Sequence, residues 1–390
     1  MSAPRSTPLC RQATASGASS EAVADALASQ LAGSQAALVL AFADHRLDLR
    51  HLGAVLERTV EAPFVGGATT GVISSHARWP RGPGGDPQPE PEPRAVAVAL
   101  SRAWFRVGLG VARDLGHNAV ASARAATHQA ACSLKIAPAL LDPARHVALS
   151  LFDGRCGQEE SFCVGSAGAA PQLRFVGGVP WAPAGAANLV VGSEGLRDAG
   201  VVVVLESARA FRTVSSVHVE PSPVRCVVTQ SHGRRILELD GFPAASRYRK
   251  LLAELGAPEL PIEQLFARYP LAMYLRGTPY IRSIRAAHGE VLEVTSAISS
   301  GQVLRLMCAA DLVGATAKDF ALAEQALGSI ELLLAFSCIS RRRDAASRLL
   351  EASMAALDAR YPVVGFDSHG EQTGMVLVNH TLSGLAIGGI

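Results

Sequence analysis

The chain carries one short string twice, because Phe64-Val65-Gly66-Gly67 recurs as Phe175-Val176-Gly177-Gly178. A related string, Val363-Val364-Gly365-Phe366, stands near the C-terminus. Each string follows an apolar run after an intervening segment of helical length, and the three runs are residues 38–42, 147–152 and 332–336. The repetition predicts that one supersecondary unit, strand–helix–strand followed by a glycine turn, is used more than once.

The repeated unit predicts an α/β fold with duplicated strand–helix–strand units in two pseudo-related halves and mixed sheets flanked by helices. Hydrophobic residues make up 49% of the 390 residues and aromatic residues only 5%. The core is therefore built mainly from Ala, Val and Leu, which suits sheets covered by helices. We place a disordered tail at 1–18, an N-terminal domain at 19–209 with a proline-rich loop at 80–93, and a C-terminal domain at 210–390.

Local signals predict several boundaries. Ser20 and Asp48 are expected to cap the first two helices, whose apolar residues recur at helical spacing. Residues 188–192 and 200–205 are expected to form a hairpin.

Charge and cysteine usage narrow the class of protein. The net charge is +2, and no long basic block indicates nucleic-acid binding. Seven scattered cysteines without a C-x-x-C pair indicate a reducing compartment rather than a disulfide framework or a zinc ribbon. Neither a signal peptide nor an apolar run of about 20 residues, enough to span a bilayer, is visible. We therefore expect a cytoplasmic protein with no nucleic-acid or membrane partner.

The glycine turns are the first candidate for a binding site. Free backbone N–H groups in such turns can hold an anion. The first turn adds the hydroxyls of Thr69 and Thr70, and the last adds His369 and Glu371. In the alternative interpretation the glycines only turn the chain or allow a helix to pack on the sheet.

Two further groups could carry chemistry. Cys338 follows a buried strand and precedes Arg341, so that Cys338, His369 and Glu371 could form a nucleophile–base–orienter set if their strands are parallel neighbours. The alternative is a small buried thiol that only packs. His117 and His128 lie on one expected helix and could ligate haem iron, although most lone histidines are solvated or structural.

At these residues the chain resembles the FIST proteins, which carry paired FIST-N and FIST-C domains. The C-terminal resemblance runs through Leu237-Glu238-Leu239-Asp240-Gly241, Tyr269-Pro270-Leu271-Ala272, Leu334-Ala335-Phe336-Ser337-Cys338, Pro362-Val363-Val364-Gly365-Phe366 and Asn379-His380-Thr381. The N-terminal resemblance covers residues 38–71, the second glycine string and residues 200–205. Together they span roughly residues 20–388, and no kinase, cyclase or F-box segment remains, as in a stand-alone bacterial copy.

The resemblance implies a sensory module of signal transduction that binds a small ligand such as an amino acid, with a histidine kinase or a diguanylate cyclase as its output partner. It also leaves open a partner-binding scaffold and a haem-dependent nitric-oxide sensor; no cofactor is otherwise expected. The family is not known for catalysis, so we expect no enzyme, with a Cys338-dependent activity as the alternative. The candidate ligand-binding residues are Gly66, Gly67, Thr69, Thr70, Gly177, Gly178, Cys338, Arg341, Gly365, Phe366, His369, Gly370 and Glu371.

Overall fold

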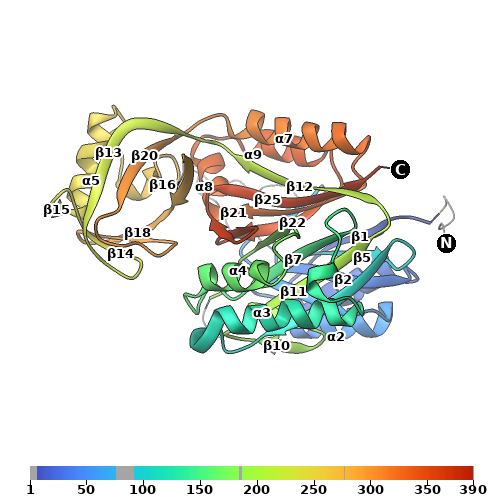
Figure 1. Cartoon of the computed structure of the whole chain (residues 1–390). Helices are drawn as coiled ribbons and strands as arrows, with labels where there is room; N and C mark the ends of the chain where they lie inside the picture. The colour runs from blue at the N-terminus through green and yellow to red at the C-terminus, as the bar shows by residue number, and fades with distance from the viewer. Residues whose placement is uncertain (1–6, 76–91, 184–186, 276, 390) are drawn as a thin grey trace.

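The computed structural model describes residues 7–75, 92–183, 187–275 and 277–389. Three sheets pack together into a body, and a fourth sheet forms a lobe at one end, as Figure 1 shows. The mixed α/β fold predicted from the sequence is confirmed. Among the described residues, no helix is both long enough and apolar enough to cross a bilayer.

The repeated unit occurs three times in the body, once in each sheet. In every copy the two strands lie side by side and parallel, and a helical segment connects them. The copies are β2 (Ala36–Asp44), α2 (Leu49–Val60) and β3 (Phe64–Thr69); β7 (His146–Phe152), α4 (Glu159–Gly168) and β8 (Phe175–Gly178); and β21 (Leu332–Cys338), α8 (Ile339–Ser347), α9 (Glu351–Asp358) and β22 (Val363–Ser368).

The remaining strands of the body extend these three parallel pairs. The sheet orders are β1-β5-β2-β3-β9-β10, β24-β23-β8-β7-β11-β6 and β12-β25-β21-β22-β4. The added strands are β1 (Cys10–Ser16), β4 (Val72–Ser74), β5 (Arg94–Ser101), β6 (Phe105–Ala112), β9 (Leu189–Val191), β10 (Glu194–Leu196), β11 (Gly200–Ser207), β12 (Ala210–Val217), β23 (Glu371–Thr373), β24 (Val376–Val378) and β25 (Thr381–Gly388). Because β4 joins the third sheet and β23 joins the second, the two halves of the chain interlock.

The C-terminal lobe is built between β12 and the third copy. Its sheet runs β17-β16-β20-β13-β14-β19-β18, with β15 paired to β14, and the long strands β13 and β20 lead to it from the body (Figure 1). The lobe consists of β13 (Val219–His232), β14 (Arg235–Leu239), β15 (Phe242–Pro243), α5 (Ala244–Glu254), α6 (Ile262–Leu265), β16 (Leu271–Leu275), β17 (Thr278–Arg282), β18 (Ile284–His288), β19 (Val291–Val294) and β20 (Val303–Ala309). Tyr248 of α5 is fully buried against this sheet.

The other helices cover outer faces of the body and follow from sequence signals. α1 (Ser20–Leu31) buries Val23, Leu27 and Leu31, and α2 begins at the predicted cap Asp48, whose side chain accepts from the Arg50 N–H. The first cap is Ser19 rather than Ser20, because the Ser19 hydroxyl accepts from the Ala22 N–H. α3 (Leu115–Ser133) packs on β6, and α7 (Leu312–Leu327) packs on β12.

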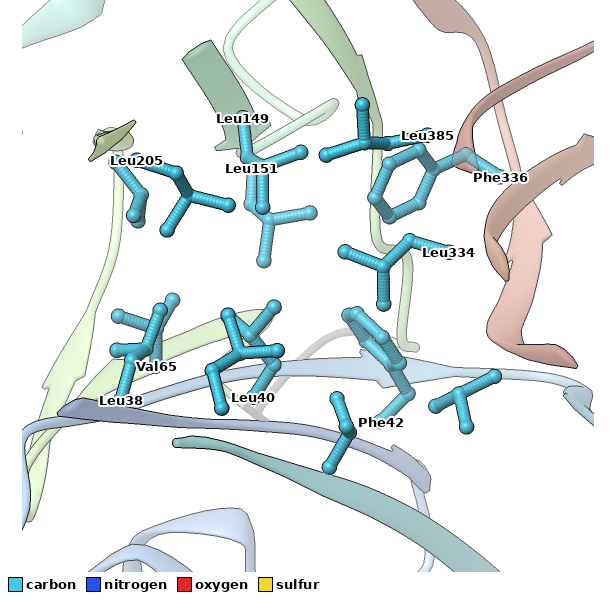
Figure 2. Packing of buried hydrophobic residues seen from close by; sticks show 14 of the residues in the cluster. Leu38, Leu40, Phe42, Val65, Leu149, Leu151, Leu205, Leu334, Phe336 and Leu385 are labelled. Atoms are coloured by element: carbon cyan, nitrogen blue, oxygen red, sulfur yellow. The ribbon is translucent and has the colours of Figure 1, made fainter. Parts of the chain in front are cut away.

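Apolar side chains fill the space between the three sheets. Figure 2 shows Leu40 and Phe42 of the first copy facing Leu149 and Leu151 of the second and Phe336 of the third. The centroid of the Phe366 ring lies 4.8 Å from the centroid of the Phe42 ring and 5.4 Å from that of the Phe336 ring. Phe42, Phe336 and Phe366 form an aromatic centre that joins the first and third copies.

Two expectations about local structure are wrong. Residues 10–16, expected in a disordered tail, form β1, which pairs with β5 along its whole length. The hairpin of residues 188–192 with 200–205 does not form, because β9 pairs with β3 in the first sheet and β11 pairs with β7 and β6 in the second. Most of the proline-rich loop at 80–93 lies outside the described residues.

Candidate functional site

A cavity of about 630 Å³ lies where the strands of the repeated unit end, between the body and the C-terminal lobe. The carboxyl ends of parallel strands are the usual place for ligands in α/β folds. Its lining residues are Asp44, His45, Thr70, Trp181, Ile284, Arg285, Ala286, Thr295, Cys338, Ile339, Ser340, Arg342, Arg343 and His369. Three of the predicted site residues, Thr70, Cys338 and His369, therefore meet in one cavity.

Each copy of the repeated unit contributes one equivalent residue to this cavity. Gly67, Gly178 and Phe366 occupy the same position of the repeated string, and the residue three places later is Thr70, Trp181 and His369 respectively. The Trp181 and His369 rings stack, with centroids 4.9 Å apart and an interplanar angle of 22°. The three copies thus converge on the cavity, as the repetition predicts.

An equivalent residue also stands at the end of the first strand of each copy or directly after it. The strand registers, continued by two residues in the second copy, align Asp44, Asp153 and Cys338, each two places beyond a core residue of the first strand. Asp44 accepts from the Arg46 N–H at 2.9 Å, and Asp153 accepts from the Arg155 N–H at 3.0 Å, so both strands end in the same Asp-x-Arg turn. The third copy replaces this turn with Cys338 and the start of α8.

The C-terminal lobe provides the remaining wall. Ile284, Arg285 and Ala286 belong to β18, and Thr295 follows β19. The Thr295 hydroxyl donates to Asn379 Oδ1 at 2.7 Å, which holds this edge of the lobe to the body. Both parts of the chain therefore face the cavity.

Further polar contacts beside the cavity join the lobe to the body. Ser283 Oγ and His380 Nδ1 lie 2.5 Å apart, and both residues are buried. Arg234 of the lobe forms ion pairs with Glu159 and Glu160 at the start of α4.

The cavity is electropositive. Arg285, Arg342 and Arg343 line it against one carboxylate, Asp44, which already forms an ion pair with Arg46. Arg342 pairs with Asp367 at 2.5 Å and Arg285 pairs with Glu293 at 3.4 Å, whereas Arg343 is exposed and has no ion pair within the described ranges.

The start of α8 adds to this positive field. Ile339 and Ser340, its first two residues, line the cavity. The N-terminal end of a helix favours negative charge. The site is therefore suited to an anionic group.

His369 is a neutral wall residue in this field. Burial, followed by the nearby charges of Arg343 and Arg285, lowers the pKa of His369 to about 3. Its Nε2 atom is buried without a hydrogen-bond partner among the described residues. A neutral imidazole beside two guanidinium groups cannot serve as an acid near pH 7.

The fold brings the proposed nucleophile, base and orienter close together, but these three residues, Cys338, His369 and Glu371, do not form a hydrogen-bonded chain. The parallel pairing of β21 with β22 on which it depended is present, with Cys338 opposite Ser368. Glu371, however, accepts from Ser368 Oγ and from Thr381 Oγ1 instead of orienting His369. Burial, with a smaller contribution from Glu371, raises the pKa of the Cys338 thiol to about 12. These features favour the alternative of a packed, protonated thiol.

Arg341 points away from the cavity, unlike the prediction. The side chain of Arg341 is fully buried. Its guanidinium donates one hydrogen bond to Thr316 Oγ1 at 2.6 Å and another to the Ser216 carbonyl at 3.3 Å. Burial lowers the pKa of Arg341 to about 10. The arginines of α8 that do line the cavity are the next two residues, Arg342 and Arg343.

The repeated glycines are packing positions inside strands rather than turns around a ligand. The third residue of each string lies opposite a small residue: Gly66 opposite Ala41, Gly177 opposite Ser150 and Gly365 opposite Ala335. A Cβ on Gly177 or Gly365 would overlap a backbone carbonyl of the neighbouring strand, at 2.0 Å and 1.7 Å. These glycines therefore let the two parallel strands approach closely.

The other predicted residues near the strings also pack away from the cavity. A Cβ on Gly67 would meet Pro180, and one on Gly178 would meet Phe336 and Phe366. Phe366 belongs to the aromatic centre, Thr69 is buried and donates to the Asp367 carbonyl, and Gly370 is buried beside Leu377.

His117 and His128, the predicted haem ligands, lie apart from this cavity. Both are exposed on α3, and neither belongs to the lining of the cavity between the body and the lobe. The haem-binding alternative gains no support from this cavity and stays a prediction. No group of three or more metal-ligating side chains is present among the described residues.

Sequence reasoning missed several cavity residues. Trp181 follows the second string at the same spacing as Thr70 follows the first, so the repeat itself contained the signal. Asp44 is marked by the Asp-x-Arg turn shared with Asp153. Arg285 could not be found in this way, because the lobe that carries it contains no copy of the unit.

Two family models together match most of the chain. The family model described as the FIST N domain matches residues 37–241, and the one described as the FIST C domain matches residues 244–373. The matches meet near β15, inside the lobe, whereas the sequence predicts a division between residues 209 and 210. No curated protein matches the chain. Among solved structures, the cyanuric acid hydrolase from A. caulinodans is similar at a TM-score of 0.39 and 12% identity, covering 98% of this chain and 99% of that chain.

Proposed function

Because the chain belongs to the FIST family, whose domains are associated with sensing in signal transduction, we propose that it is a sensor that binds a small anionic metabolite between its body and its C-terminal lobe. The observation that carries the proposal is the cavity of about 630 Å³ at the ends of the repeated strands. Ligand sites typically have volumes of about 300–1,000 Å³ and a few convergent polar groups.

The ligand class follows from the groups that face the cavity. A carboxylate would bind near Arg343 and the first turn of α8, beside Arg285, whose guanidinium also pairs with Glu293. Asp44, the last residue of β2, lines the same cavity, and its carboxylate can accept a hydrogen bond from an ammonium group. Amino acids and related small carboxylates therefore fit the site best.

A sensor also requires that binding changes the protein. Ligand contacts to β18 on one side and to α8 on the other would stabilise one arrangement of the lobe against the body. The output would then pass to a signalling protein such as a histidine kinase or a diguanylate cyclase. We assign no catalytic role to Cys338, because its buried thiol has a pKa far above neutral.

A thermal-shift screen tests the proposal. The purified chain is heated in the presence of single amino acids and small mono- and dicarboxylates, each at millimolar concentration. A ligand present at 100 times its Kd stabilises the folded state by about 2.7 kcal/mol, which is a readily measured shift. If no compound of the panel raises the unfolding temperature, the proposed receptor role is wrong for this ligand class.

A further inference from the structure

Part of one face of the sheet in the C-terminal lobe, on the middle of β13 and the start of β20, is exposed and carries a pair of like charges. Along β13, Cys226 and Val228 are buried beneath α5, so Arg225 and Val227 point to the opposite face. Across the ladder, Arg225 lies opposite Arg305 of β20. Like charges directly opposite each other destabilise a sheet.

Neither arginine has an ion-pair partner in the part of the chain that the structure describes. Arg225 is exposed, and within the described ranges it has no hydrogen bond from its side chain. Arg305 lies over the Tyr274 ring, 5.1 Å from its centroid, and its Nε has no hydrogen-bond partner among the described residues. The contact with Tyr274 holds the guanidinium at the surface without removing its charge.

Exposed apolar side chains surround this pair. Val227 and Val303 lie opposite each other and are 37% and 57% exposed. Tyr274 on β16 lies on the same face and is 37% exposed. Single exposed apolar residues are ordinary, whereas a contiguous group bordering two unneutralised cations is typical of an interaction surface.

We propose that this outer patch, made of Arg225, Val227, Tyr274, Val303 and Arg305, docks a partner protein through a segment in which acidic and apolar side chains alternate. Carboxylates of the partner would bridge Arg225 and Arg305, and its apolar side chains would cover the two valines and Tyr274. Charge complementarity favours this occupant, because a second copy of the same basic patch would be repelled.

The place of the patch suits an output surface of the proposed sensor. It lies on β16, β20 and β13, and the same sheet ends in β18, which forms a wall of the cavity. The docking proposal itself rests only on the lobe, so it stands or fails independently of any ligand in the cavity.

Selection from a random peptide library displayed on phage tests the proposal with the full chain as bait. The expected result is enrichment of peptides that combine acidic and apolar residues. A synthetic copy of an enriched peptide should bind Arg225→Glu at least about tenfold more weakly, because the bridging cation is replaced by a repelling charge. Arg212→Glu, which makes the same change on exposed β12 of the body, should bind the peptide like the parent chain.

Stability measurements separate docking from folding. A glutamate at 225 would face Arg305 and replace a repulsion by an attraction, so the unfolding temperature of Arg225→Glu should stay equal or rise. No enrichment, enrichment without an excess of acidic residues, or equal binding to Arg225→Glu would each overturn the proposal. A fall in the unfolding temperature would show that the arginine pair serves the fold instead.

Discussion

Adding a single methyl group at Gly365 should damage the third copy of the repeated unit. The Cβ of Gly365→Ala would lie 1.7 Å from the Ala335 carbonyl oxygen and 2.6 Å from the carbon of that group. Both are backbone atoms of β21, which is fixed by parallel pairing on one side and by β25 on the other. No side-chain rotation can relieve this overlap, so the two central strands of the third sheet must separate.

The expected loss is about 3 kcal/mol, the upper end of the usual range for overpacking a core. For a domain of 150–250 residues, each kcal/mol moves Tm by about 2–4 °C, so Tm should fall by about 6–12 °C. Circular dichroism during heating measures this change. Gly168→Ala is the matched control, because no atom lies within 4 Å of its added Cβ and alanine favours the helix that contains it.

If Gly365→Ala unfolds at the same temperature as the parent chain, the close approach of the strands is not what the glycine provides. Its role would then have to be sought in the turn beyond the strand, as the sequence first indicated.

Three other predictions follow from the packing and charges of the site. Phe336→Ala should lower the free energy of unfolding by about 3–5 kcal/mol, measured by denaturant titration, because it empties the aromatic centre; a loss below about 1 kcal/mol would contradict that role. Burial raises the pKa of Glu371 from 4.5 to about 8, so the protonated side chain stabilises the fold at low pH, and this contribution to the free energy of unfolding is lost as the pH rises from 4.5 through 8. Glu371→Gln should therefore flatten the fall in stability over this pH range. An unchanged pH profile would show that Glu371 is ionised throughout. Cys338 should react with iodoacetamide far more slowly than the exposed Cys132 at pH 7.5, as mass spectrometry of the folded chain can show, and equal rates would restore the nucleophile hypothesis.

The repeated unit could be predicted because its signal is local. An apolar run, a helical segment and a glycine string recur in order, and each was found as two parallel strands joined by a helix. The convergence of the copies on Thr70 and His369 followed from the rule that parallel strands end at one edge.

Other features could not be read from the chain because they depend on distant partners. Among the described strands, β1 is an edge strand that pairs with β5, which lies more than 70 residues later, so the polar residues of β1 resembled a tail. The role of Gly177 and Gly365 depends on which residue of the neighbouring strand lies opposite, and the register decides that. Arg341 and Arg343 are indistinguishable in sequence, whereas their place on α8 buries one and exposes the other.

Isothermal titration of a small carboxylate identified by the thermal screen tests the central claim most directly. The parent chain should bind it at one saturable site, and Arg343→Ala should weaken binding by about tenfold or more, since a charge-assisted hydrogen bond contributes about 1.5–3 kcal/mol. Arg124→Ala, which removes an exposed arginine from α3, should leave the affinity unchanged. Equal affinity in the parent chain and in Arg343→Ala would show that the ligand binds outside this cavity.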